Sequence, residues 1–133
     1  MTSASIVKEA LEQLGAECQV YLPNRFTDGY GPNASVYKYF IDNQGISLFI
    51  TVDNGVAGHE AIELAQSMGV DVIVTDHHSM PEELPNAYAI VHPEHSRADY
   101  PFKHLAGCGV AFKLATALLE EVQIELLDLV AIG

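Results

Sequence analysis

Two clusters of ionisable residues follow two apolar stretches of the sequence. Asp53 comes directly after ISLFITV, and Asp76, His77 and His78 come directly after DVIVT. If these stretches are neighbouring parallel strands, their ends lie about 4.8 Å apart and their polar side chains gather at one edge of a sheet. Carboxylate oxygen and imidazole nitrogen together suit Mn, Fe or Zn better than Ca. The pattern therefore predicts a divalent-metal site that Asp53 and His77 share.

Each of these residues also has an interpretation without chemistry. Asp53 could cap a helix that begins near Val56, because Asp commonly accepts hydrogen bonds from the first amides of a helix. His77 and His78 could be loop residues that face solvent. Three consecutive ionisable residues after an apolar strand are costly unless they are used or solvated. The combination of the two clusters therefore favours a functional site.

A second candidate is the segment LAGCGVAFKL, in which Gly107 and Gly109 open a predicted helix. Free amides at a helix N-terminus attract phosphate oxygens. Glycines at helix starts also serve close packing, and this alternative stays open. Between them, Cys108 is expected to be a small buried packing residue and not a nucleophile, since no Cys-His-Asn pattern accompanies it.

Hydrophobic periodicity predicts the elements that must position these residues. We expect an α/β domain built on a mainly parallel sheet, because helices and strands alternate with short connections. Asn33 is expected to cap the helix that follows it, and Gly45 is expected to end that helix. The expected helices cover 3–14, 34–44, 57–68, 107–121 and 123–131, and the expected strands cover 17–22, 46–52, 71–75 and 87–93.

Composition narrows the class of protein. The 133 residues are 49% hydrophobic, which excludes a disordered tail, and no apolar run approaches the ~20 residues that span a bilayer. Without a signal-peptide pattern or a disulfide framework, we expect a cytoplasmic protein that does not associate with membranes. The formal net charge of −12 argues against a general polyanion binder. Three of the six basic residues nevertheless fall between 97 and 113, where they form either a local cationic patch or a solvated loop.

The sequence around the two clusters resembles the DHH phosphoesterase superfamily. VTDHH after an apolar strand, preceded by ITVDNG, is similar to two of the four motifs of that superfamily. The segments PNRFTDGYG, LPNAYAIVHP and YPFKHLAGCGVAFKL extend the resemblance, along the whole chain, to the catalytic core of RecJ-type single-strand-specific 5′→3′ DNA exonucleases. The resemblance implies a three-layer Rossmann-like fold and two divalent ions, Mn²⁺ or Mg²⁺, as cofactors.

The same resemblance implies roles for individual residues. Asp53 would bridge both metal ions, and His77 would bind one of them. Asp76 would orient the histidines or bind metal weakly, and His78 would contact the scissile phosphate. For contacts with single-stranded DNA, the candidates lie in two loops and at the helix that the glycines open: Arg25, Tyr30, Lys103, His104, Gly107 and Gly109.

Two parts of the family pattern are not found in the sequence. An Asp-x-Asp-Gly motif would precede the first helix, and a further Asp would follow the Leu-Val-Ala-Ile-Gly segment. We therefore expect residues 1–133 to form a partial DHH domain, truncated at both ends, with little or no activity alone. Such a domain is also expected to self-associate through an open sheet edge. In addition, His92 stands where the family usually has Asn before Pro.

Two other functions stay open. The first is a DHH phosphodiesterase that acts on short oligoribonucleotides or cyclic dinucleotides, which would prefer substrates of a few nucleotides over long strands. The second is a non-catalytic Rossmann-like binding module in which Asp53 and the Asp-His-His triplet are relics. Such a module would not bind Mn²⁺ through His77.

Overall fold

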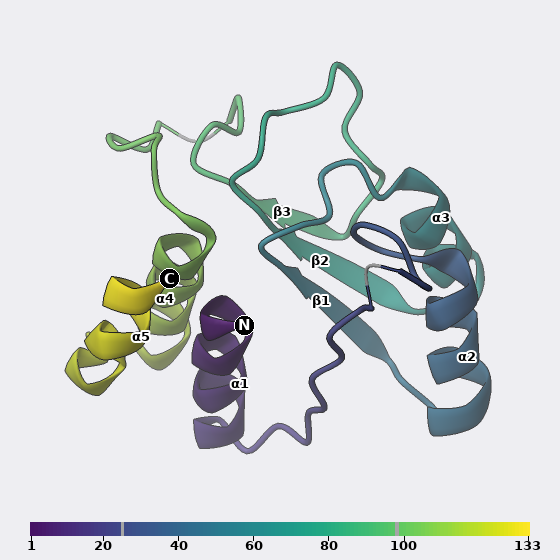
Figure 1. Ribbon diagram of the computed structural model, residues 1–133, viewed down its shortest axis with the longest axis horizontal. Coiled ribbons are helices and arrows are strands. Elements are labelled where there is room, and N and C mark those ends of the chain that lie inside the picture. The colour runs from purple at the N-terminus through teal and green to yellow at the C-terminus, as the bar shows by residue number, and fades with distance from the viewer. Residues whose placement is uncertain (25, 98) are drawn as a thin grey trace.

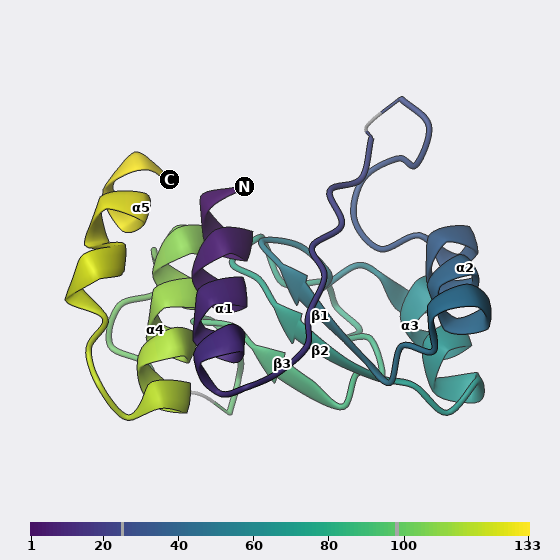
Figure 2. The same cartoon turned by 90° about the horizontal axis from the view of Figure 1, so that it is seen from below.

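Helices cover both faces of a central sheet. The computed structural model describes residues 1–24, 26–97 and 99–133. Figure 2 shows α2 and α3 on one side of the sheet and α1, α4 and α5 on the other. The predicted three-layer α/β architecture is therefore confirmed. The helices are α1 Thr2–Gln13, α2 Ala34–Gln44, α3 His59–Ser67, α4 Gly107–Leu119 and α5 Leu127–Ile132, with a 3₁₀ turn η1 at Ile124–Leu126.

The sheet has three strands in the order β1-β2-β3, and both pairs are parallel. The strands are β1 Leu48–Val52, β2 Asp71–Thr75 and β3 Ala89–Val91. Val52 pairs with Thr75, so the residues that follow β1 and β2 start from neighbouring points. In Figure 1 these strand ends share one edge of the sheet, and the loops that carry the polar clusters leave from that edge.

Each face of the sheet packs into its own hydrophobic core. On one face, Val72 and Val74 of β2 pack with Ile62 of α3. On the other face, Ile50 and Val52 of β1 pack against the core formed by α1, α4 and η1, with α5 partly buried against it. Because both faces are covered, the strands are apolar at nearly every position and do not alternate with polar residues.

The ends of α2 follow the sequence expectation. The Asn33 side chain accepts hydrogen bonds from the backbone amides of Ser35 and Val36, at 2.9 and 3.2 Å. Gly45 ends the helix with φ of 63°, a left-handed conformation that glycine adopts without the steric cost of a Cβ. Both predicted caps are therefore confirmed.

Two expected elements differ in the structure. The strand expected at 17–22 is wrong, because this segment has no regular secondary structure. Its side chains are largely exposed, and Tyr21 instead packs edge-to-face on Phe40 of α2 with ring centroids 5.3 Å apart. A strand needs a neighbour to pair with, and the ladders among the described residues join only β1 to β2 and β2 to β3. The helix expected at 123–131 is divided into η1 and α5.

Within the described part of the chain, no helix combines the length and the apolar character that crossing a membrane requires. The self-association expected through an open sheet edge stays a prediction.

Candidate metal centre and its surroundings

Asp53 occupies a tight turn that aims its side chain across the sheet edge. Its φ is 64°, a left-handed value that Asp adopts more readily than most residues, at a cost of about 1 kcal/mol. The Asp53 amide donates to the Thr75 carbonyl at 2.9 Å, and the Thr75 hydroxyl donates to the Thr51 carbonyl at 2.7 Å. These bonds tie the turn to both strands. The backbone strain is therefore held in place by the ladder beneath it.

The candidate metal ligands meet at this turn. Oδ1 of Asp53 lies 3.0 Å from Nε2 of His77, and one ligand atom from each of Asp53, His77 and His78 lies within 4.8 Å of the others. Two donor atoms bound at ~2.1 Å to one ion at a right angle are about 3.0 Å apart, because the right angle multiplies the bond length by the square root of two. Asp53 and His77 are therefore close enough to hold one divalent ion together, to which they would supply a carboxylate oxygen and an imidazole nitrogen.

Asp76 is buried beneath the histidines and accepts hydrogen bonds with both carboxylate oxygens. Its side chain is 1% exposed. Oδ1 accepts from the amides of His77 and His78 at 2.8 and 3.2 Å, and from Nδ1 of His78 at 2.7 Å. Oδ2 accepts from the amide of Val56 at 3.1 Å. Val56 lies in the turn before α3, and the N-cap residue of α3, Gly58, makes no side-chain cap hydrogen bond. Asp76, and not Asp53, thus holds the Val56 amide.

These hydrogen bonds determine the ionisation state of Asp76. Desolvation by burial acts to raise its pKa, but the hydrogen bonds from the His78 ring and from the Val56, His78 and His77 amides together outweigh it, so the pKa lies below its ordinary value. Asp76 is therefore a carboxylate at neutral pH. Because the Asp76 carboxylate accepts from Nδ1 of His78, that nitrogen carries a proton, and Nε2 is the ring nitrogen that this bond leaves available.

Gly107 gives Asp53 the space for its side chain. A Cβ at Gly107 would overlap the Asp53 carboxylate and lie only 2.8 Å from the Asp53 Cβ. At Gly109 a Cβ would approach only a Leu105 methyl, at 3.1 Å. This contact favours the close-packing interpretation of Gly107 and places the N-terminus of α4 against the carboxylate of a candidate ligand. The positive end of the helix dipole stabilises such a charge.

His92 belongs to the same region, although the sequence identified it only as an unusual residue before Pro93. It is 4% exposed and follows β3 directly. Its Nδ1 accepts from the Glu94 amide at 3.0 Å, so its Nε2 carries the proton. Nε2 donates to the His78 carbonyl at 2.8 Å. The position of His92 at the end of a third parallel strand is the sequence signal that could have linked it to the two polar clusters.

Three of the residues expected to contact DNA are exposed loop residues. Tyr30 is 82% exposed, and Lys103 and His104 are exposed in the loop before α4. The ring of His104 lies edge-on to Phe102, with centroids 6.0 Å apart. Arg25 lies outside the described residues. The assignment of these side chains to DNA binding stays a prediction.

As expected, Cys108 is buried, at 4% exposure.

Comparison with known proteins identifies relatives along the full chain. Residues 1–133 match the family model described as "DHH family, N-terminal domain". The single-stranded-DNA-specific exonuclease RecJ of Bacillus subtilis (strain 168) is 51% identical over 133 residues, which are 100% of this chain and 17% of that protein. The RecJ exonuclease of Escherichia coli (strain K12) is 43% identical over 99% of this chain and 26% of that protein. The chain thus spans about a sixth to a quarter of the length of these relatives.

Solved structures agree with the sequence relatives. A crystal structure of exonuclease RecJ bound to manganese superposes with a TM-score of 0.84 at 33% identity, covering 99% of this chain and 34% of that one. A crystal structure of RecJ from Thermus thermophilus in complex with Mn²⁺ superposes with a TM-score of 0.80 at 32% identity, covering 99% of this chain and 19% of that one. Since the family model, the relatives and the superpositions each cover at least 99% of the sequence, the chain belongs to the DHH family.

Proposed function

We propose that this chain contributes to a metal-dependent active site that hydrolyses phosphodiester bonds of single-stranded DNA from the 5′ end, as part of a cytoplasmic DNA repair or recombination enzyme. The observation that carries the proposal is the 3.0 Å contact between Asp53 Oδ1 and His77 Nε2, with a ligand atom of His78 within 4.8 Å. The names of the relatives support the choice of single-stranded DNA as substrate.

The donor set fits a divalent ion. The carboxylate oxygen of Asp53 and the imidazole nitrogen of His77 suit Mn²⁺, with Mg²⁺ as the alternative, and the manganese-bound RecJ structures support the first choice. Asp53 would bridge two ions, and His77 would bind one of them. When bound, such ions activate a water molecule and stabilise charge on the attacking and leaving oxygens of a phosphodiester. Asp76 acts as an orienting carboxylate, because its oxygens already accept four hydrogen bonds from the protein.

His78 would contact the scissile phosphate. Asp76 fixes its Nδ1, so Nε2 is the atom that faces the substrate. When the ring is protonated, Nε2–H donates to a phosphate oxygen, and the Asp76 carboxylate balances the positive charge. In the overall reaction, a water oxygen forms a bond to phosphorus and the bond from phosphorus to the 3′ oxygen breaks. The products are a 5′-nucleotide and a strand that is shorter by one residue.

Asp53→Asn tests the metal site directly. Asparagine tolerates the left-handed backbone as well as aspartate does, so we expect the free energy of unfolding to change by less than about 0.5 kcal/mol. The variant lacks the anionic ligand, and Mn²⁺ affinity is expected to fall by at least about 100-fold. Electron paramagnetic resonance of free Mn²⁺ measures the affinity.

The matched control for this variant is Asp71→Asn. Asp71 is an exposed carboxylate at the opposite end of β2, so this variant is expected to bind Mn²⁺ like the unaltered chain. If Asp53→Asn bound Mn²⁺ normally, the metal site would be assigned to the wrong residues.

Activity is best tested in a chimera, because the chain spans only part of its relatives. The 133 residues replace the matching segment of the Bacillus subtilis exonuclease, with which they are 51% identical. We expect Mn²⁺-dependent release of nucleotides from 5′-phosphorylated single strands, and loss of this activity in the Asp53→Asn and His77→Ala chimeras. The Asp71→Asn chimera should stay active.

The same chimera separates the competing functions. A folded, metal-loaded chimera that preferred di- and trinucleotides or cyclic dinucleotides over long strands would contradict the single-strand exonuclease assignment. Absence of Mn²⁺ binding in both the chain and the chimera would instead favour a non-catalytic binding module.

A further inference from the structure

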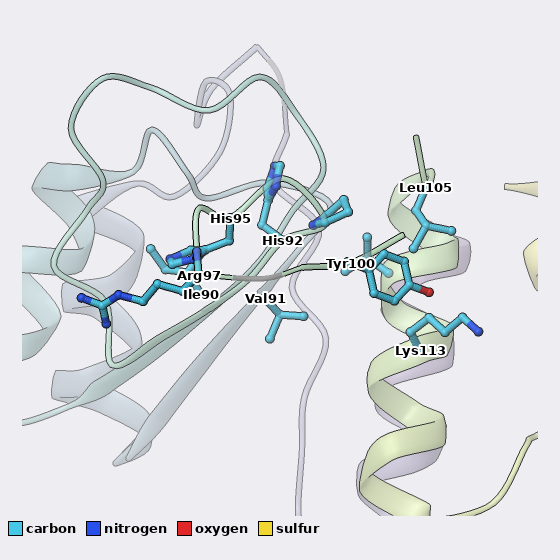
Figure 3. Close-up of a pocket in the computed structure, with 10 residues that line it drawn as sticks. Ile90, Val91, His92, His95, Arg97, Tyr100, Leu105 and Lys113 are labelled. Atoms are coloured by element: carbon cyan, nitrogen blue, oxygen red, sulfur yellow. The ribbon is translucent and has the colours of Figure 1, made fainter. Parts of the chain in front are cut away.

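A pocket of about 430 Å³ lies between β3, the loop that follows it and α4. Figure 3 shows its lining residues, with β3 and the loop on one side and α4 on the other. Ile90, Val91 and Val110 supply an apolar floor, and Tyr100 supplies an aromatic ring from the loop. The volume is within the range of small-molecule sites, roughly 300–1,000 Å³.

The charge of this lining is opposite to that of the chain as a whole. The chain carries eighteen acidic and six basic residues. Among the described residues that line the pocket, two are basic, Arg97 and Lys113, and none is acidic. Both basic side chains are exposed, and Figure 3 shows them at opposite ends of the pocket. Of the two interpretations that the sequence left open, a local cationic patch and a solvated loop, we take the patch for Arg97 and Lys113, because two basic side chains without an acidic neighbour in the lining favour an anionic ligand.

The loop wall of the pocket is held by its own hydrogen bonds. Nδ1 of His92 accepts from the Glu94 amide at 3.0 Å, and Nδ1 of His95 accepts from the Arg97 amide at 3.1 Å. The His95 amide in turn donates to the His92 carbonyl at 3.1 Å. Both rings line the pocket, and these bonds fix their orientation. Residues 92–97 of the wall therefore need little reorganisation to accept a ligand.

The pocket is also connected to the candidate metal centre. The buried residue His92 lines the pocket, and its Nε2 donates a hydrogen bond to the His78 carbonyl at 2.8 Å. A ligand beside His92 therefore lies one side chain away from the Asp-His-His segment. A ligand that combines a flat, largely apolar ring with a phosphate would match the apolar floor, the Tyr100 ring and the two basic ends.

We propose that this pocket binds one nucleotide of the DNA strand, with the base on the apolar floor and the phosphate at Lys113. The identification of the ligand as a nucleotide of single-stranded DNA rests on the proposed function. Lys113 attracts the phosphate as a point charge on a flexible stem, and Tyr100 contributes ring contact that does not depend on the base sequence.

Titration of the chain with thymidine 5′-monophosphate, thymidine and inorganic phosphate tests this site. EDTA is present throughout, so that binding does not involve the metal centre. Amide NMR shifts are expected to change at Val91, Tyr100 and Val110, and the nucleotide is expected to bind about tenfold more tightly than either part alone. Lys113→Gln should weaken nucleotide binding by about five- to tenfold and leave thymidine binding unchanged. The matched control is Lys38→Gln, on α2 across the sheet.

Three results would overturn the assignment. If inorganic phosphate bound as tightly as the nucleotide, the pocket would be a simple anion site. If thymidine bound as tightly as the nucleotide, the pocket would be an apolar site. If Lys113→Gln and Lys38→Gln bound the nucleotide equally well, the pocket would not hold the phosphate. Mn²⁺ binding is measured separately and is expected to be unchanged in Lys113→Gln, so failure of the nucleotide site is distinguishable from failure of the metal site.

Discussion

Gly107→Ala is expected to weaken Mn²⁺ binding by about tenfold or more, an effect of the size seen when a residue that orients a metal ligand is lost. The backbone at Gly107 is compatible with alanine, and alanine is the better helix former, by up to about 1 kcal/mol. The unfavourable contact is with the neighbouring side chain of Asp53. The new Cβ would overlap the Asp53 carboxylate and lie 2.8 Å from the Asp53 Cβ. Asp53 must therefore move away from His77, and the spacing of the two ligands is lost.

Gly109→Ala is the matched control for this prediction. It changes a glycine two residues further along the same helix, where the new Cβ meets only a flexible Leu105 methyl at 3.1 Å. We expect its Mn²⁺ affinity to match that of the unaltered chain, by electron paramagnetic resonance. Equal affinities for the two alanine variants would show that the Asp53–Gly107 contact does not position the ligand.

A second substitution at Asp53 tests the cause of any loss of stability. Glycine at position 53 has no Cβ and adopts the positive φ without strain. If Gly107→Ala destabilises the fold through the clash, then Asp53→Gly in the same chain should restore the free energy of unfolding. Denaturant unfolding of the two single variants and the double variant measures this coupling.

Asp76→Ala is expected to destabilise the fold by about 3–5 kcal/mol, which is a large share of the stability of a domain of this size. The substitution removes one carboxylate that accepts four hydrogen bonds. The buried amide of Val56 loses its acceptor, which costs roughly 1–3 kcal/mol, and the part-buried amides of His77 and His78 lose theirs at a smaller cost. The expected fall in melting temperature is roughly 10 °C or more, by circular dichroism.

Asp71→Ala serves as the control, because it removes an exposed carboxylate from the other end of the same strand. Its unfolding free energy should change by less than about 0.5 kcal/mol. Asp76→Asn removes the charge but keeps the shape of the side chain. Its amide oxygen still accepts hydrogen bonds, whereas its NH₂ group is a donor placed among the N–H donors that surround Asp76. A stability for Asp76→Ala equal to that of Asp71→Ala would contradict the role given to the buried carboxylate.

The depressed pKa of Asp76 also predicts a dependence of stability on pH. Hydrogen bonds lower the folded-state pKa below the unfolded value of about 3.9, so the folded state favours the ionised form. The contribution of Asp76 is therefore fully present above pH ~4 and is lost as the pH falls through the folded-state pKa. The free energies of unfolding of the unaltered chain and of Asp76→Asn, plotted against pH, should run parallel above pH ~4. Below pH ~4 the curve of the unaltered chain should fall more steeply.

Several features could be predicted from the sequence because they depend on local chemistry. The Asn33 cap and the Gly45 end of α2 follow from side-chain acceptors and backbone freedom within a few residues. The strands at 48–52 and 71–75 follow from continuous apolar runs that only a sheet covered on both faces can bury. The strand expected at 17–22 is wrong because a strand also needs a partner that lies elsewhere in the chain, and local sequence does not show whether that partner is present.

The sequence by itself determined the ionisable clusters, the α/β alternation and the resemblance to the DHH family, since residue type and spacing carry all three. Only the tertiary structure decided which atoms meet. It brought Asp53 to His77, gave the Val56 amide to Asp76 instead of Asp53, and set Gly107 against the Asp53 side chain. It also joined β3, the loop after it and α4 into one pocket with two basic ends. These contacts link residues 20 to 54 positions apart, and at such separations packing, rather than local preference, determines which side chains touch.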